Sequence, residues 1–163
     1  GHEILLEHAD LLGFVVDGNT VQPNSEGRHE NLDLRDSNDL ITPVAAMMAL
    51  GEGGRIVGAA HAAYKESNRI TKTRELLEQF GLTCTTQEDG LEVPGGQRIS
   101  TPESLVLTHE DHRLQMTALV LALGCEGQVT IEGDGLHGVA DPQAVSRWRD
   151  AGVAIESFLY QPE

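Results

Sequence analysis

The sequence predicts a mixed domain of the α+β class, and three observations lead to this prediction. The chain has 163 residues, of which 39% are hydrophobic, so it is long enough for one domain with a buried core. Short apolar runs and longer amphipathic segments follow one another in the order strand, strand, helix, strand, helix. This order occurs twice, at a spacing of about 72 residues, which exceeds the period of common solenoid repeats and indicates a duplicated unit. Such an order favours sheets whose helices pack on one face.

The first copy is expected to extend over about residues 10–82. It predicts strands at 12–16 and 29–34, a helix at 39–50, a strand at 55–58 and a helix at 67–80. The last helix has one apolar stripe formed by Ile70, Leu77 and Phe80. Gly81 follows it and is predicted to end it, because glycine readily adopts the left-handed conformation that closes a helix.

The second copy is expected at about residues 83–155, so that the whole chain, 1–163, is a single domain. It predicts strands at 91–93, 104–107 and 129–132, and helices at 112–123 and 142–151. Pro142 suits the first turn of the last helix, where no backbone N–H is needed. Residues 137–141 are expected to be a connector.

Charge and composition exclude several classes of partner. The formal net charge of −15 argues against nucleic acid or an anionic membrane as a general partner. No apolar run approaches the roughly 20 residues that span a bilayer. Only two lysines, Lys65 and Lys72, accompany nine arginines, so any anion site must be built mainly from arginine. Cys84 and Cys125 are too few for a disulfide framework, and we expect reduced packing residues of a cytoplasmic protein.

Three polar clusters fall at the starts of predicted helices: Asp39, Lys65-Glu66-Ser67-Asn68-Arg69 and Asp111-His112-Arg113. Free N–H groups and the positive end of the helix dipole accept phosphate or carboxylate there. The same dipole disfavours an arginine in the first turn, so Arg69 and Arg113 should have anionic partners. Those partners are either a doubly anionic ligand or the neighbouring acids Asp39, Glu66 and Asp111.

A metal site is not expected. His109-Glu110-Asp111-His112 contains two histidines with helical spacing, but Glu110 and Asp111 lie outside the face they share. No third ligand is evident. His61, four residues before Lys65, either lines the same cleft or is a solvated loop residue.

The ordered segments Asn38-Asp39-Leu40-Ile41, Lys65-Glu66-Ser67-Asn68-Arg69-Ile70 and Asp111-His112-Arg113-Leu114-Gln115-Met116 resemble the 5-enolpyruvylshikimate-3-phosphate synthase family. The resemblance covers nearly the whole chain but only the C-terminal portion of the enzyme, so we expect the N-terminal domain to be absent. It implies repeated βαβαββ units of an enolpyruvyl-transferase-like domain, an inverse α/β barrel with helices in the interior. This chain would carry two of the three units and part of the third.

The resemblance also implies a reaction that needs no cofactor or metal. The enolpyruvyl group of phosphoenolpyruvate moves to the 5-hydroxyl of shikimate 3-phosphate, in the shikimate pathway of aromatic amino-acid biosynthesis. Asp39 would help remove the hydroxyl proton, and Glu66 would protonate the methylene carbon and take the proton back. The residues implied in substrate binding are His61, Lys65, Arg69, His112 and Arg113. The isolated domain is expected to be inactive, because the site lies between two domains.

Two positions depart from the family's pattern. Asn68 stands where the family usually has aspartate, which is expected to change an ion pair to Arg69. Val139 stands where the family has a lysine that holds phosphoenolpyruvate, and no lysine follows Lys72. His137 could replace it in part. Two alternatives therefore remain: a diverged, non-catalytic anion-binding module, or a relative of UDP-N-acetylglucosamine enolpyruvyl transferase. The Asp-His-Arg motif favours the shikimate enzyme over the latter.

Overall fold

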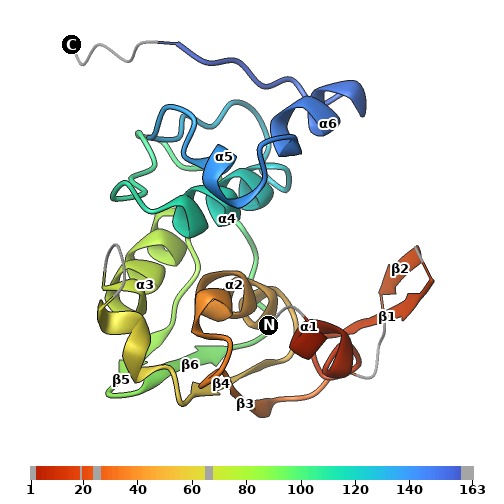
Figure 1. Cartoon of the computed structure of the whole chain (residues 1–163), viewed down its shortest axis with the longest axis vertical. Helices are drawn as coiled ribbons and strands as arrows, with labels where there is room; N and C mark the ends of the chain where they lie inside the picture. The colour runs from red at the N-terminus through yellow and green to blue at the C-terminus, as the bar shows by residue number, and fades with distance from the viewer. Residues whose placement is uncertain (1–2, 19, 24–26, 65–67, 159–163) are drawn as a thin grey trace.

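The computed structural model describes residues 3–18, 20–23, 27–64 and 68–158, and one mixed sheet lies at the lower end of the view with helices over one face (Figure 1). The sheet has the order β3-β4-β6-β5. Its strands are β3 Glu30–Asp33, β4 Gly53–Val57, β5 Thr85–Gln87 and β6 Gly90–Pro94. β3 and β4 pair in parallel, whereas the other pairs are antiparallel. The α+β class is confirmed, and β5 is a strand that the sequence pattern did not predict.

Helix α2 (Ile41–Leu50) makes the crossover between the two parallel strands, and the short 3₁₀ helix η1 (Asn38–Leu40) leads into it. Its apolar residues are buried nearly all round, with Val44 and Ala45 fully inaccessible, as expected of a helix in a core. Figure 1 shows α2 and α3 on the same side of the sheet. The predicted helix 39–50 is therefore confirmed, with a tighter first turn.

Helix α3 (Arg69–Gln79) begins and ends where local chemistry dictates. The Asn68 side chain caps it by accepting a hydrogen bond from the Thr71 N–H at 3.2 Å. Gly81 has φ +73°, and the Leu82 N–H then donates to the Leu77 carbonyl at 2.9 Å. The predicted glycine termination is confirmed.

The second half of the chain holds α4 (His112–Ala122), close to the predicted helix 112–123. The predicted strands 104–107 and 129–132 are wrong in extent, because only one parallel bridge joins Val106 to Ile131. The next residue, Leu107, has its N–H and C=O bonded to the Gln79 side chain at 2.7 and 3.1 Å instead of to a strand. The pairing stops there for that reason.

The expected connector at 137–141 contains a helical turn, α5 (His137–Ala140), so that prediction is wrong. The last helix, α6 (Ala144–Asp150), begins later than the predicted 142–151. The Asp141 carboxylate accepts the Gln143 N–H at 3.1 Å and bonds the Arg147 guanidinium, which places a turn between the two helices. Pro142 lies in that turn and not in the helix.

The N-terminal segment contains α1 (Glu3–Glu7) and the antiparallel hairpin of β1 (Phe14–Asp17) and β2 (Thr20–Pro23), which projects from the body of the molecule (Figure 1). Cys84 and Cys125 are free thiols that pack against the core. Burial raises the pKa of the Cys84 thiol to about 11. Within the described residues, no helix has the length and apolarity needed to cross a membrane.

Candidate anion site at three helix N termini

Three helix starts supply the charged residues of the candidate site. Asp39 lies in η1, at the entry to α2, and Arg69 is the first residue of α3. Asp111 is the N-cap of α4, and its carboxylate accepts the Arg113 N–H at 2.9 Å. A carboxylate at this position satisfies a free backbone donor and complements the helix dipole. The predicted placement of these clusters at helix starts is confirmed for the described residues.

The Arg69 guanidinium is held between two carboxylates. Its Nε donates to Oδ2 of Asp111 at 2.8 Å, and its Nη1 donates to Oδ1 of Asp39 at 2.5 Å. The Arg69 side chain is 1% exposed, and that of Asp111 is fully buried. Charges taken out of water in this way require close, hydrogen-bonded partners. The expectation that Arg69 has anionic partners is confirmed, and here the partners are acids of the chain itself.

Arg113 is less fully engaged than Arg69. Its Nη2 lies 3.8 Å from Oδ2 of Asp39, beyond hydrogen-bonding distance. Its Nε is buried and has no acceptor among the described residues. A buried donor without an acceptor is uncommon and calls for an explanation. An acceptor group of a ligand would satisfy it.

Asp39 therefore lies between the two guanidiniums. Its side chain is 46% exposed, in contrast to the buried Asp111. Planar guanidiniums bind phosphate and carboxylate groups with two parallel hydrogen bonds. The arrangement can therefore receive an anion from the solvent side, next to a carboxylate that can accept a proton.

The other predicted site residues come from the segment before α3 and from the first turn of α4. Lys65 and Glu66 lie outside the described residues. His61 is exposed on the 3₁₀ helix η2 (Ala60–Tyr64), which precedes them. His112 is the half-buried first residue of α4, beside Arg113 in the sequence. The structure thus brings Asp39, Arg69 and Arg113 together.

Asp111 was not among the predicted catalytic or substrate-binding residues, although it is the buried partner of Arg69. An aspartate directly before a helical stretch is an N-cap signal, and that signal was present. Asp111 was one of the acids expected as a possible partner of Arg69, and no local pattern could choose it over a ligand, because the two residues are 42 positions apart. Asn68 is a neutral helix cap, and its expected effect on an ion pair to Arg69 stays a prediction.

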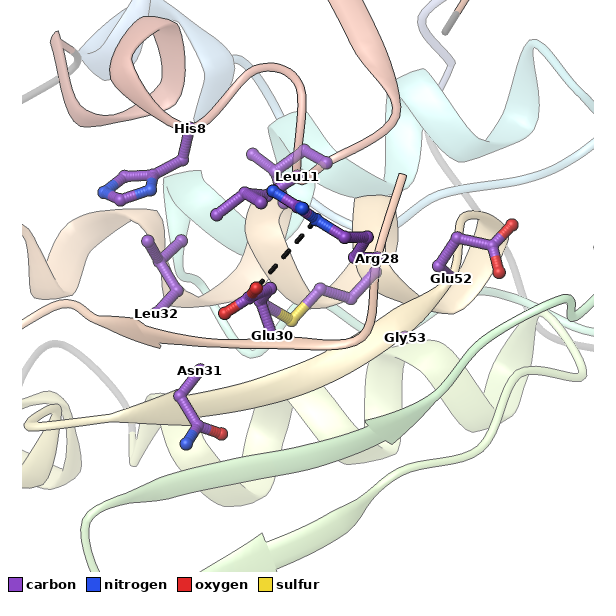
Figure 2. A pocket seen from close by; sticks show the side chains of 10 residues that line it. His8, Leu11, Arg28, Glu30, Asn31, Leu32, Glu52 and Gly53 are labelled. Carbon is purple, nitrogen blue, oxygen red and sulfur yellow. Dashed lines mark ion pairs between the residues drawn. The ribbon is translucent and has the colours of Figure 1, made fainter. Parts of the chain in front are cut away.

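Two hollows in the described part of the chain lie away from these residues. The first, of about 10 Å³, is no larger than one water molecule needs. Figure 2 shows the Arg28–Glu30 ion pair lying across it, at 4.0 Å between Nε and Oε1. The second, of about 440 Å³, is an open, mostly apolar hollow lined by residues of the β1–β2 hairpin, such as Phe14, and by Met47 of α2. Neither contains Asp39, Arg69 or Arg113.

The fold and the site define a class: an α+β domain in which acidic and arginine side chains meet at helix N termini. The chain belongs to the EPSP synthase (3-phosphoshikimate 1-carboxyvinyltransferase) family, whose sequence profile matches residues 10–140.

Curated relatives support this membership over nearly the whole chain. It is 35% identical to the 3-phosphoshikimate 1-carboxyvinyltransferase of Halorubrum lacusprofundi over 162 residues, which covers 96% of this chain and 36% of that protein. It is 30% identical to the enzyme of the same name from Methanobrevibacter smithii, with 96% and 35% covered. The chain therefore spans little more than a third of the length of these relatives.

Solved structures agree at the level of the fold. An EPSP synthase structure from Acinetobacter baumannii superposes with a TM-score of 0.61 at 21% identity, covering 80% of this chain and 32% of that one. A second structure of EPSP synthase from the same organism gives a TM-score of 0.59 at 20% identity, with 90% and 36% covered.

Proposed function

We propose that this chain is the part of an enolpyruvyl transferase that holds phosphoenolpyruvate while its enolpyruvyl group moves to the 5-hydroxyl of shikimate 3-phosphate. Phosphate is released, and the product serves aromatic amino-acid biosynthesis. The observation that supports this best is the buried Arg113 Nε without an acceptor, next to Asp39 and Arg69. Family membership and the names of the relatives support the choice of reaction.

The proposed chemistry divides between two carboxylates. Glu66 gives a proton to the methylene carbon of phosphoenolpyruvate, while the 5-hydroxyl oxygen attacks the adjacent carbon and its proton passes to Asp39. In the tetrahedral intermediate the attacked carbon is bonded both to the former 5-hydroxyl oxygen and to the phosphate ester oxygen. Glu66 then takes a methyl proton back as the C–O bond to phosphate breaks, and the proton held by Asp39 leaves with the phosphate. Two acids in different environments can divide acid and base duties in this way.

The anion is bound, in this proposal, by Arg113 and Arg69, with His112 beside them. Arg113 offers the unsatisfied donor, and Asp111 fixes the orientation of Arg69 from behind. Guanidiniums that are preoriented in this way stabilise the charge that develops on the departing phosphate. Lys65 and His61 are proposed to contact shikimate 3-phosphate.

The finer architecture is part of the same proposal. In the first half, helix α2 joins the parallel strands β3 and β4, and in the second half α4 joins Val106 to Ile131, which form a single parallel bridge. This supports two repeat units, about 10–82 and 83–155, of an inverse α/β barrel domain. An N-terminal domain is the proposed partner that completes the site, since enzymes of two domains commonly close over their substrates.

Calorimetry with inorganic phosphate and with phosphoenolpyruvate tests the anion site in the chain as it stands. We expect Arg113→Ala to remove binding and Arg98→Ala, which deletes an exposed arginine, to leave it unchanged. Equal binding by both variants would rule out Arg113 as the anion ligand. Mixing the chain with a complementary N-terminal domain should then restore phosphate release from the two substrates.

A second candidate function, a non-catalytic anion-binding module, is favoured by one observation. Val139 is 70% exposed on α5, at the position where the family carries a lysine. This function predicts phosphate binding by the chain but no phosphate release with the complementary domain at any ratio.

A further inference from the structure

The segment that leads into α4 is a tight turn with an unusual backbone. The Asp111 N–H donates to the Thr108 carbonyl at 3.0 Å, and both intervening residues have positive φ, +54° at His109 and +57° at Glu110. They are the non-glycine residues with positive φ in the described part of the chain. Two such residues in succession make a type I′ turn, which normally contains glycine or asparagine. A backbone of this kind persists only when its surroundings hold it.

The side chain of Glu132, the residue after Ile131, accepts two hydrogen bonds from the backbone of this turn. Oε2 of Glu132 accepts the Thr108 N–H at 2.7 Å and the His109 N–H at 3.0 Å. Thr108 is fully buried, so its N–H requires an acceptor within the protein. Glu132 is itself fixed, because its N–H donates to the Val106 carbonyl at 2.9 Å and its carbonyl accepts the Gln115 amide at 2.9 Å.

The turn determines where two charged groups of the site lie. Asp111 closes it and immediately meets Arg69, and Arg113 follows two residues later. On the other side, Gln79 of α3 holds the backbone of Leu107, the residue just before the turn. The turn is therefore clamped between α3, which carries Arg69, and Glu132.

We propose that Glu132 is a positioning residue: its carboxylate holds the 108–111 turn so that Asp111 and Arg113 face Arg69. The part of this inference that concerns a ligand rests on the proposed function. The part that concerns geometry does not, since it follows from the two hydrogen bonds and the buried ion pair. Glu132 acts through the turn and touches neither the substrate nor the arginines.

Three variants of Glu132 distinguish the effect of side-chain length from the effect of the carboxylate charge. Glu132→Gln keeps an acceptor oxygen at the same reach and loses the charge. Glu132→Asp keeps the charge and withdraws the carboxylate by one methylene. Glu132→Ala removes both. Thr101→Ala is the control, since the Thr101 hydroxyl also accepts a backbone N–H, that of Glu126 at 3.1 Å, in a loop away from the site.

The first measurement needs no ligand. In ¹H–¹⁵N spectra the buried Arg69 Nε–H should exchange slowly with solvent in the unaltered chain, in Glu132→Gln and in Thr101→Ala. It should exchange at least about tenfold faster in Glu132→Asp and Glu132→Ala, because the Asp111 acceptor is displaced. Fast exchange in Glu132→Gln together with slow exchange in Glu132→Asp would overturn the proposal, since charge would then be what matters. Glu132→Gln and Glu132→Asp decide this even if Glu132→Ala does not fold.

The second measurement is phosphate affinity by calorimetry. We expect a roughly tenfold to hundredfold loss in Glu132→Asp, the scale that a small misplacement of binding groups produces, and near-unaltered binding in Glu132→Gln. If the unaltered chain binds no phosphate but the exchange pattern holds, the proposed function fails and the positioning role stands. If phosphate binds equally to all variants and Arg69 exchange is unchanged, the positioning role fails and the proposed function stands.

Discussion

Arg69 and Asp111 form an ion pair between the first turns of two helices, with 2.8 Å between Nε and Oδ2. Neither side chain has appreciable contact with solvent, since Arg69 is 1% exposed and Asp111 fully buried. Asp39 binds the same guanidinium from the exposed side. The pair therefore lies at the edge of the core, and a ligand would approach Arg69 from the side of Asp39.

Removing the buried carboxylate should destabilise the chain strongly. In Asp111→Ala the Arg69 charge loses its inner partner and α4 loses its cap, so we expect a fall of about 3–5 kcal/mol in the free energy of unfolding. Urea denaturation followed by circular dichroism measures it. Asp36→Ala removes an exposed carboxylate before η1 and should leave the midpoint nearly unchanged. Similar midpoints for both variants would show that Asp111 is not a buried partner.

Asp39 should compete with anions for the arginines. Among the described residues, the charges of Arg69 and Arg113 are balanced by those of Asp39 and Asp111, so a dianion must replace the interaction with Asp39. We expect Asp39→Asn to tighten phosphate binding by about tenfold, equivalent to ~1.4 kcal/mol.

Asp36→Asn makes the same change in net charge at an exposed position before η1 and should have little effect on phosphate affinity. Calorimetry at one ionic strength compares the two variants. Weaker binding in Asp39→Asn than in the unaltered chain would mean that Asp39 helps to hold the anion.

Adding a cation on α5 tests the departure at Val139. If this position corresponds to the family's lysine, Val139→Lys should strengthen phosphoenolpyruvate binding by about tenfold through a charge-assisted contact. Ala140→Lys adds the same charge at the next exposed position and should do much less. An equal gain in phosphoenolpyruvate affinity in both variants would indicate a general effect of net charge. Position 139 would then no longer be assigned to the family's lysine.

The pair of Lys72 and Glu75 predicts a pH dependence of stability. The Lys72 ammonium, 2.6 Å from the Glu75 carboxylate, lowers the pKa of that carboxyl below its ordinary value of 4.5, and His109 adds to this effect. A pKa lowered in the folded state stabilises the protein above the pKa of the unfolded chain. That contribution is lost as the pH falls below about 4.5.

Both side chains of this pair are about one-third exposed, so we expect Lys72→Met to cost less than about 1 kcal/mol at pH 7 and nothing measurable at pH 3. A double-mutant cycle with Glu75→Gln, followed by urea denaturation at both pH values, isolates the pair. A coupling energy that is the same at both pH values would contradict this account.

The end of α3 and the start of α4 were the parts of the fold that the sequence predicted best. Capping and termination depend on a few neighbouring residues, so the signals at Gly81 and Asp111 could be interpreted locally, whereas the cap at Asn68 was not predicted. The clustering of charge at helix starts was predictable for the same reason.

Pairings between distant segments were not predictable. The apolar pattern of 104–107 suggests a full strand, yet Gln79, 28 positions away, takes the hydrogen bonds of Leu107. No local pattern indicates that a distant side chain will take the backbone hydrogen bonds that a neighbouring strand would otherwise make. In the same way, the type I′ turn at His109 and Glu110 contradicts their intrinsic preferences and depends on Glu132. The catalytic and substrate-binding roles of all the predicted site residues stay predictions: Asp39, His61, Lys65, Glu66, Arg69, His112 and Arg113.

The Arg69–Asp111 pair has a consequence for how the chain unfolds. Its cation belongs to the first half of the chain and its anion to the second. Separating the two halves would leave Asp111 as a lone charge in the interior of the second half and would leave Arg69 with Asp39 alone, so each half would lose stability that it has in the intact chain. Melting should accordingly occur as a single transition, and a protease that nicks one half should unravel both.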